Sequence, residues 1–103
     1  MPDTRQLVSW LFFTLEIYNL MTWKEENNKL KKEYQFKDFP QAMIWMMECS
    51  YHIEKQGHHP EWFNVYNTVK VELTTHDTGN TITEKDWKLA ETMDDCYLKF
   101  SQF

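Results

Sequence analysis

Residues 38–57 read DFPQAMIWMMECSYHIEKQG, and they carry the signals of a helix about which the rest of the domain can be arranged. The Asp38 carboxylate can accept hydrogen bonds as an N-cap, and Pro40 falls in the first turn, where its missing N–H costs nothing. Gly57 is a typical helix stop. The spacing therefore predicts a central helix that runs to about Gln56 and lies against a sheet formed by the flanking segments.

Apolar residues follow this predicted helix on two faces. A helix that rests on one sheet needs only one apolar face, so the second face is either additional core or a subunit contact. Methionine and aromatic residues are enriched at interface cores, which favours the contact. The first face carries Phe39, Ala42, Met43, Met46, Cys49 and Ile53, and the second carries Ile44, Trp45, Met47 and Tyr51.

The segments on either side of the helix predict strands. Residues 23–29 are polar and turn-like, and residues 30–36 then alternate with a period of two, as in a half-exposed strand. Residues 61–67 contain two asparagines and predict a short strand followed by a turn. Residues 69–73 alternate clearly between apolar and polar side chains, as in an amphipathic strand.

Two further helices complete the prediction. Residues 4–21 form an apolar helix, and the last helix begins at Thr83. The order of helix, strand, helix, two strands and helix predicts an α+β domain over residues 1–103, with helices packed on one face of a small antiparallel sheet. The buried face of the last helix should carry Trp87, Ala90, Met93, Tyr97 and Phe100.

The composition limits the function. With a formal charge of −5 and a pI of about 5.3 the chain lacks the basic character of a nucleic-acid-binding protein. Five Trp, seven Phe and six Met are more apolar bulk than one small core needs, so part of it should face another subunit.

The sequence also indicates a reducing environment. The apolar run Leu7–Met21 is interrupted by polar residues and is shorter than the roughly 20 residues of a membrane span, and no signal peptide is predicted. Cys49 and Cys96 lie on different predicted helices without metal-ligand spacing, which favours small buried side chains over a disulfide. We therefore predict a cytoplasmic protein that does not bind membranes, with a nuclear location left open.

Three of the four histidines, His58, His59 and His76, fall within 19 positions. Imidazole changes charge near neutral pH, so the cluster points to proton transfer or to a metal site. Pro60 favours an extended His59, which turns the two adjacent imidazoles to opposite sides and gives them different roles. Zinc ligation by the three histidines with Glu54 or Asp86 is the rival. Adjacent histidines suit one tetrahedral ion poorly, and no HExxH motif is present.

The spacing of these residues is similar to that of a known family. An acidic residue is followed after three positions by His-His-Pro, after five more by an aromatic, after nine more by His and about ten positions on by Asp. Together with Phe36-Lys37-Asp38-Phe39, Ala42 and Trp23, this pattern resembles the pterin-4a-carbinolamine dehydratases, from about Trp23 to Ala90. The positions are held by Glu54, His58, His59, Pro60, Tyr66, His76 and Asp86.

The resemblance implies a fold and an activity. It implies an antiparallel sheet of about four strands with three helices on one face, assembled as a homodimer or homotetramer through strand edges and the second face of the central helix. It implies loss of water from a 4a-hydroxytetrahydropterin such as 4a-hydroxytetrahydrobiopterin to give the quinonoid dihydropterin, in tetrahydrobiopterin recycling. The pterin is the substrate, and neither a cofactor nor a metal is expected.

The resemblance also assigns roles. His58 and His76 become the acid and base that protonate the 4a-oxygen and deprotonate N5, without an order between them. Asp86 joins them as a catalytic candidate, although Thr83 to Asp86 also fits a capping pattern. The substrate-binding candidates are His59, Glu54, Pro60, Trp23 and Trp62.

Two further points follow from the resemblance. Some members of the family bind a homeodomain transcription factor as a dimerisation cofactor, so a protein-interaction module without catalysis is the alternative function. The chain also departs from the family pattern, because Asn80 stands where a second glycine is common, which predicts an altered loop after His76.

Overall fold

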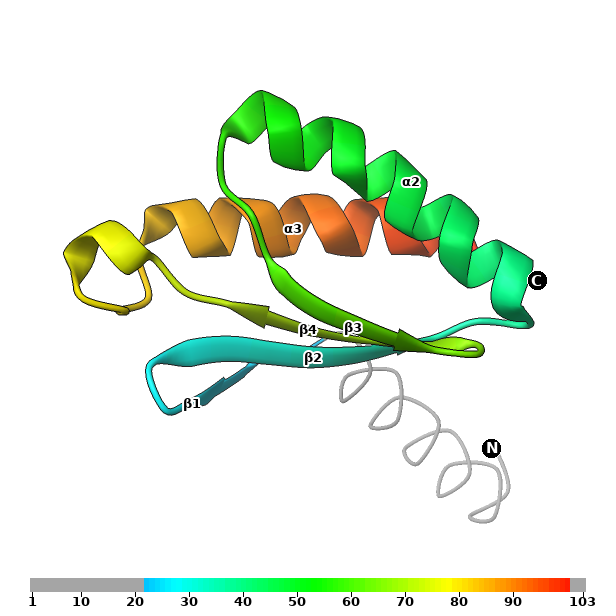
Figure 1. Ribbon diagram of the computed structural model, residues 1–103, viewed down its shortest axis with the longest axis horizontal. Coiled ribbons are helices and arrows are strands. Elements are labelled where there is room, and N and C mark those ends of the chain that lie inside the picture. Colours follow the sequence, from blue (N-terminus) through cyan, green and yellow to red (C-terminus); the bar gives the residue numbers. More distant parts are fainter. Residues whose placement is uncertain (1–21, 101–103) are drawn as a thin grey trace, which may run out of the picture.

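The computed structural model describes residues 22–100, and within this range two α-helices cover one face of a four-stranded sheet (Figure 1). The predicted helix at residues 4–21 lies outside the described residues. The elements in chain order are β1 (Lys24–Glu26), β2 (Lys29–Gln35), α2 (Phe39–Gln56), β3 (Glu61–Val65), β4 (Thr68–Leu73), the short 3-10 helix η1 (His76–Thr78) and α3 (Glu84–Leu98).

The sheet is antiparallel throughout, in the order β1-β2-β4-β3. This confirms the predicted α+β class and the four strands. Residues 22–100 contain two α-helices, α2 and α3, rather than the three of the prediction, whose first helix falls outside the described range. Both lie on the same side of the sheet, with α2 crossing above α3 in Figure 1.

Strand β1 corrects the prediction of a turn over residues 23–29. Only Asn27 and Asn28 form the turn, both with positive φ, and Lys24 pairs with Lys31 across the hairpin. All three β1 residues are exposed, so the strand has no alternation of apolar and polar side chains. This strand forms because it pairs with β2. Its sequence lacks the alternation of apolar and polar residues from which a strand is predicted.

Helix α2 begins and ends as predicted. The Asp38 side chain accepts a hydrogen bond from the Gln41 N–H at 3.0 Å, and Gly57 adopts the left-handed conformation with φ 65°. The predicted faces need correction, because Trp45 is buried whereas Phe39 and Met43 are exposed. The Trp45 indole fills the core between helices and sheet, where its Nε1–H donates to the Met93 carbonyl.

Helix α3 begins after Thr83, as predicted, but its buried face is displaced from the predicted one. Trp87 is 47% exposed, whereas Asp86 is fully buried. Hydropathy does not predict a buried aspartate. The free energy cost of burying this one is offset by the hydrogen bonds described below. The buried residues of α3 are Asp86, Leu89, Ala90, Met93 and Cys96.

The two faces of the sheet differ in character. Leu30, Tyr34, Val69, Val71 and Leu73 are buried under the helices. The opposite face carries a network of ion pairs. These pairs are open to solvent, so each contributes little to stability. Its members are Lys29, Lys31, Glu26, Glu61 and Glu72.

Two predictions about environment can be compared with the structure. Cys49 and Cys96 are free and buried on α2 and α3, which confirms the prediction of small buried side chains. Within residues 22–100, neither helix combines the length and the apolar character that crossing a membrane requires.

Candidate active site

The three motif histidines meet at one end of the sheet. The connection from α2 to β3 descends there beside η1 and the beginning of α3 (Figure 1). A cavity of about 310 Å³ lies between these segments. We call it the histidine cavity, and its lining residues are Gly57, His58, His59, Pro60, Glu61, Thr75, His76, Asp77 and Lys85.

Local backbone geometry delivers the histidines to this cavity. The Gly57 N–H donates to the Ile53 and Glu54 carbonyls, which closes α2 and directs the chain toward β3. On the other side, the Thr75 N–H donates to the Thr81 carbonyl and closes the loop that contains η1. Both loops are thus fixed by hydrogen bonds at their ends, as is usual for loops that carry functional residues.

His58 is the buried histidine of the set, with 9% of its surface exposed. Its Nε2 atom lies 2.6 Å from Oδ1 of Asp86. A carboxylate only accepts hydrogen bonds, so the proton lies on Nε2 and the Asp86 side chain fixes both the tautomer and the orientation of the ring.

Asp86 accepts three hydrogen bonds in all. Its Oδ2 atom accepts from the Thr75 hydroxyl at 2.7 Å and from the Thr83 backbone N–H at 2.9 Å. The second of these completes a capping box with Thr83, as the sequence predicted. Asp86 does not line the histidine cavity, so it acts behind His58 as a helix cap and a positioning residue.

His76 is exposed and differently held. Its Nδ1 atom lies 2.6 Å from Oδ1 of Asn80, and its Nε2 atom lies 3.8 Å from Oε1 of Glu61. An amide oxygen accepts, so the proton lies on Nδ1 and the Nε2 lone pair is available to take a proton. The role of Asn80 extends the departure noted in the sequence, because with φ 63° it adopts a glycine-like conformation and also orients His76.

His59 is exposed and has Glu54 as its neighbour. The His59 Nε2 atom lies 3.4 Å from Oε2 of Glu54, whose side chain is 83% exposed. Because both groups are open to water, this contact is a weak one. Pro60 lines the cavity beside His59 and Glu61. His58 is buried against Asp86 whereas His59 is exposed beside Glu54, so the two adjacent imidazoles have different partners.

Trp23 and Trp62 do not line the histidine cavity. The Trp23 indole donates its Nε1–H to Oδ2 of Asp94 at 3.0 Å and is 9% exposed. The Trp62 ring packs at 6.2 Å from the Trp45 ring. Both rings pack in or against the core, and neither lines the histidine cavity.

Sequence reasoning did not assign Glu61, Thr75, Asp77 or Lys85 to the site, and it noted Asn80 only as a departure from the family pattern. Thr75 and Asn80 had a local signal, because they flank the loop after His76 and carry hydrogen-bonding side chains. Glu61 joins the site only because β3 begins beside η1. The histidines do not form the alternative zinc site with Glu54 or Asp86. Among residues 22–100, the group of potential ligand atoms that lie within 4.8 Å of one another is Glu48, His52 and Cys96.

Comparison with known proteins gives a consistent result. Residues 13–96 match the model of the family described as pterin 4 alpha carbinolamine dehydratase. A relative from Sinorhizobium medicae is 43% identical over 81 residues, which cover 77% of this chain and 76% of the relative. One from Solibacter usitatus is 49% identical over 72 residues, which cover 70% and 75%. Both relatives are provisionally named pterin-4-alpha-carbinolamine dehydratases.

Two solved structures share the fold. A transcriptional coactivator/pterin dehydratase from Brucella melitensis superimposes with a TM-score of 0.71 and 36% identity, over 82% of this chain and 90% of that one. A pterin dehydratase-like RuBisCO assembly factor of the alpha-carboxysome gives 0.59 at 18% identity, over 73% and 86%, and shows the fold alone. The sequence match over most of its length, together with this fold, shows that the chain belongs to the pterin 4 alpha carbinolamine dehydratase family.

Proposed function

We propose that this protein removes water from a 4a-hydroxytetrahydropterin, such as 4a-hydroxytetrahydrobiopterin, and releases the quinonoid dihydropterin. One observation carries the proposal: three imidazoles line a single cavity, and the described hydrogen bonds fix the proton of two of them on a defined ring nitrogen. A dehydration needs an acid and a base at fixed places. Family membership supplies the substrate class.

The proposed chemistry follows from these tautomers. Water leaves when a proton reaches the 4a-oxygen, the C4a–O bond breaks and the proton on N5 departs, which forms the C4a–N5 double bond. His76 presents Nε2 and His58 presents Nδ1, because Asn80 and Asp86 hold the protons on the other ring nitrogens. One of the two enters as the imidazolium and gives the proton of its presented nitrogen to the 4a-oxygen, and the other enters neutral and takes the proton from N5. We assign these two residues as the acid and base pair without an order between them. Each is worth about 10²–10⁴-fold in rate.

The remaining cavity residues would hold the pterin. His59 lies on the exposed rim with Glu54, so it can contact the ring without being fixed in advance. The reaction moves protons and no electrons, so it needs neither cofactor nor metal. We place the activity in tetrahydrobiopterin recycling, in the cytoplasm, with a nuclear location as the alternative.

A direct assay tests the proposal. Purified protein is added to freshly generated 4a-hydroxytetrahydropterin, and formation of the quinonoid product is followed by its absorbance with and without a chelator. We expect acceleration in both samples. His76→Ala should lower kcat, His59→Ala should raise KM, and His52→Ala, outside the cavity, is the matched control with unchanged kinetics. Full activity in His58→Ala, His59→Ala and His76→Ala would exclude this cavity as the active site.

A second candidate function rests on a different surface. Met43, Ile44, Met47 and Tyr51 form one exposed apolar face of α2, opposite its buried residues. We propose that this face contacts a second copy of the chain in a homodimer or homotetramer. A coactivator partner is the alternative, since the Brucella melitensis structure is described as a transcriptional coactivator. Sedimentation of Ile44→Glu should show a smaller assembly than the wild type, whereas an unchanged assembly would exclude self-association through this face.

A further inference from the structure

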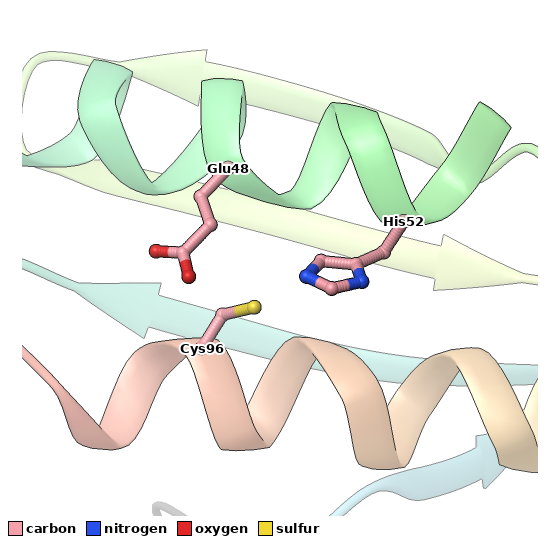
Figure 2. A group of neighbouring side chains, drawn as sticks. All are labelled: Glu48, His52 and Cys96. Atoms are coloured by element: carbon pink, nitrogen blue, oxygen red, sulfur yellow. The ribbon is translucent and has the colours of Figure 1, made fainter. Parts of the chain in front are cut away.

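A cluster of potential metal ligands lies between the two helices, away from the histidine cavity. Glu48 and His52 project from α2 toward α3, and Cys96 projects from α3 toward them (Figure 2). One ligand atom from each residue lies within 4.8 Å of the others. None of the three residues lines the histidine cavity.

The geometry of this cluster follows from the fold. Glu48 and His52 are four residues apart on α2, so their side chains lie one above the other on the same side of the helix. That side faces α3, where Cys96 is nearly fully buried. Apolar packing and hydrogen bonds from Trp45 to the Met93 carbonyl and from Gln56 to Thr92 also join the two helices, and this cluster adds a further polar contact between them.

We propose that Glu48, His52 and Cys96 bind a zinc ion that joins α2 to α3. Carboxylate oxygen, imidazole nitrogen and thiolate sulfur are the three atom types that bind zinc in proteins. A tetrahedral zinc ion holds its ligand atoms about 3.3–3.8 Å apart, so the observed spread closes with side-chain shifts of about 1 Å. Three protein ligands leave a fourth position for water.

The surroundings of the cluster are compatible with a cation. The Lys99 ammonium group forms an ion pair with Glu48, so a positive charge already lies against this carboxylate. The Lys99 side chain is 65% exposed and can move into solvent when zinc takes its place. Burial raises the pKa of the Cys96 thiol, and zinc reverses this by binding the thiolate and releasing its proton.

This site is independent of the proposed dehydratase activity. A metal that joins the helices stabilises the folded protein, because it binds the native arrangement of ligands more tightly than the unfolded chain. The chelator in the pterin assay should therefore lower thermal stability in a zinc-loaded sample without changing turnover.

Cobalt is the probe, because Co²⁺ replaces zinc and reports its ligands. Sulfur ligation gives an intense near-ultraviolet charge-transfer band that histidine-only sites lack, so binding at His58, His59 or His76 is not counted. We expect a one-to-one titration of this band in the wild type. Cys96→Ser should abolish it, and Cys49→Ser, which alters the other buried thiol of the same core, should keep it. A band in Cys96→Ser, no band in the wild type or loss of the band in Cys49→Ser overturns the proposal.

Variants of Glu48 and His52 provide a second test if Cys96→Ser disturbs folding. His52→Ala and Glu48→Gln retain both thiols, and each should weaken cobalt binding by about tenfold or more. Zinc should raise the Tm of the wild type by about 4 °C or more and leave His52→Ala unchanged. Equal zinc stabilisation of the wild type and His52→Ala overturns the assignment of His52.

Discussion

Asp86 and Asp94 lie about two turns apart on helix α3, and each accepts three hydrogen bonds from described residues. Asp86 accepts from His58, Thr75 and the Thr83 backbone, and it is fully buried. Asp94 accepts from the Trp23 indole, the Lys32 ammonium group and the Tyr34 hydroxyl, at 3.0, 2.6 and 2.6 Å. The two sites thus share residue type, helix and number of bonds.

The difference lies in what the donors do. The donors of Asp94 come from the sheet and the segment before it, and Lys32 and Tyr34 point into the core. Asp94 therefore connects α3 to β2. One donor of Asp86 is an imidazole at the edge of a cavity, so this carboxylate sets the orientation of a group that is proposed to exchange protons. The chemistry around an aspartate decides whether it serves stability or function.

Removing the imidazole that Asp86 orients should have the largest effect. His58→Ala should lower kcat for dehydration by about 10²–10⁴-fold, because a positioned acid or base is lost. Steady-state kinetics on the folded variant measure this, with circular dichroism as the folding control. A fall of less than about threefold would mean that His58 is not part of the chemistry.

Removing the other aspartate should instead affect stability. Asp94→Ala leaves the Lys32 ammonium group, whose side chain is 3% exposed, without its partner. We expect the free energy of unfolding to fall by about 3 kcal/mol in urea denaturation, with kcat of the folded fraction unchanged. A loss below about 1 kcal/mol, or a matching loss of kcat, would remove the distinction between the two aspartates.

Thr75 tests the support of Asp86 without touching the histidine. Thr75→Val keeps the shape but removes the hydroxyl that donates to Asp86, which should cost about 1–2 kcal/mol of unfolding free energy and lower kcat severalfold. Thr92→Val is the matched control on α3, since the Thr92 hydroxyl accepts from the Gln56 amide and donates to the Lys88 carbonyl, away from Asp86. Equal kinetics in the two variants would argue against control of His58 through Asp86.

The titration of Tyr34, one of the donors to Asp94, should produce the smallest effect, seen in alkali. Burial and the Asp94 charge raise the pKa of Tyr34 well above 10.0, so above about pH 10 this phenol ionises in the unfolded chain and stays protonated when folded. Its contribution to stability is complete below that pH and is lost as pH rises.

Burial lowers the pKa of Lys32 even though the Asp94 charge favours the ammonium form. Just below pH 10.5 the titration of Lys32 therefore raises the free energy of unfolding as pH rises, opposite to the effect of Tyr34. Tyr34→Phe should flatten the decline of unfolding free energy between about pH 9.5 and 11. Tyr66→Phe, at an exposed position, should retain the wild-type decline. Identical slopes in both variants would show that Tyr34 does not cause the decline.

The sequence was informative wherever the structure depends on neighbours along the chain. The ends of α2 at Asp38 and Gly57 and the capping box of α3 were predictable, because a cap is satisfied within four residues. The gathering of His58, His59 and His76 was predictable because they lie in loops that follow a helix and a strand, and the family spacing reinforced it.

Other features depend on contacts between distant segments. Strand β1 forms by pairing with β2, Trp45 joins the core because of how α2 crosses the sheet, and Trp23 reaches Asp94 across 71 positions. Cys96 had no metal-ligand spacing in the sequence, yet it lies beside Glu48 and His52 once the helices pack. Spacing along a chain cannot report ligands that tertiary packing assembles.

The most direct test compares one substitution at the two aspartates. Asp86→Asn and Asp94→Asn both remove a charge while conserving size, and both should lower Tm. An amide has one accepting oxygen, and its nitrogen only donates. In Asp86→Asn the side chain therefore cannot accept from Thr75, Thr83 and His58 Nε2–H together, because its NH₂ group must face at least one of them. His58 then loses its fixed tautomer.

The measurement is kcat for dehydration of a 4a-hydroxytetrahydropterin by both folded variants. We predict a fall of about tenfold or more for Asp86→Asn and a change of less than about twofold for Asp94→Asn. Equal kcat values in the two variants would contradict the assignment of Asp86 as the residue that positions His58.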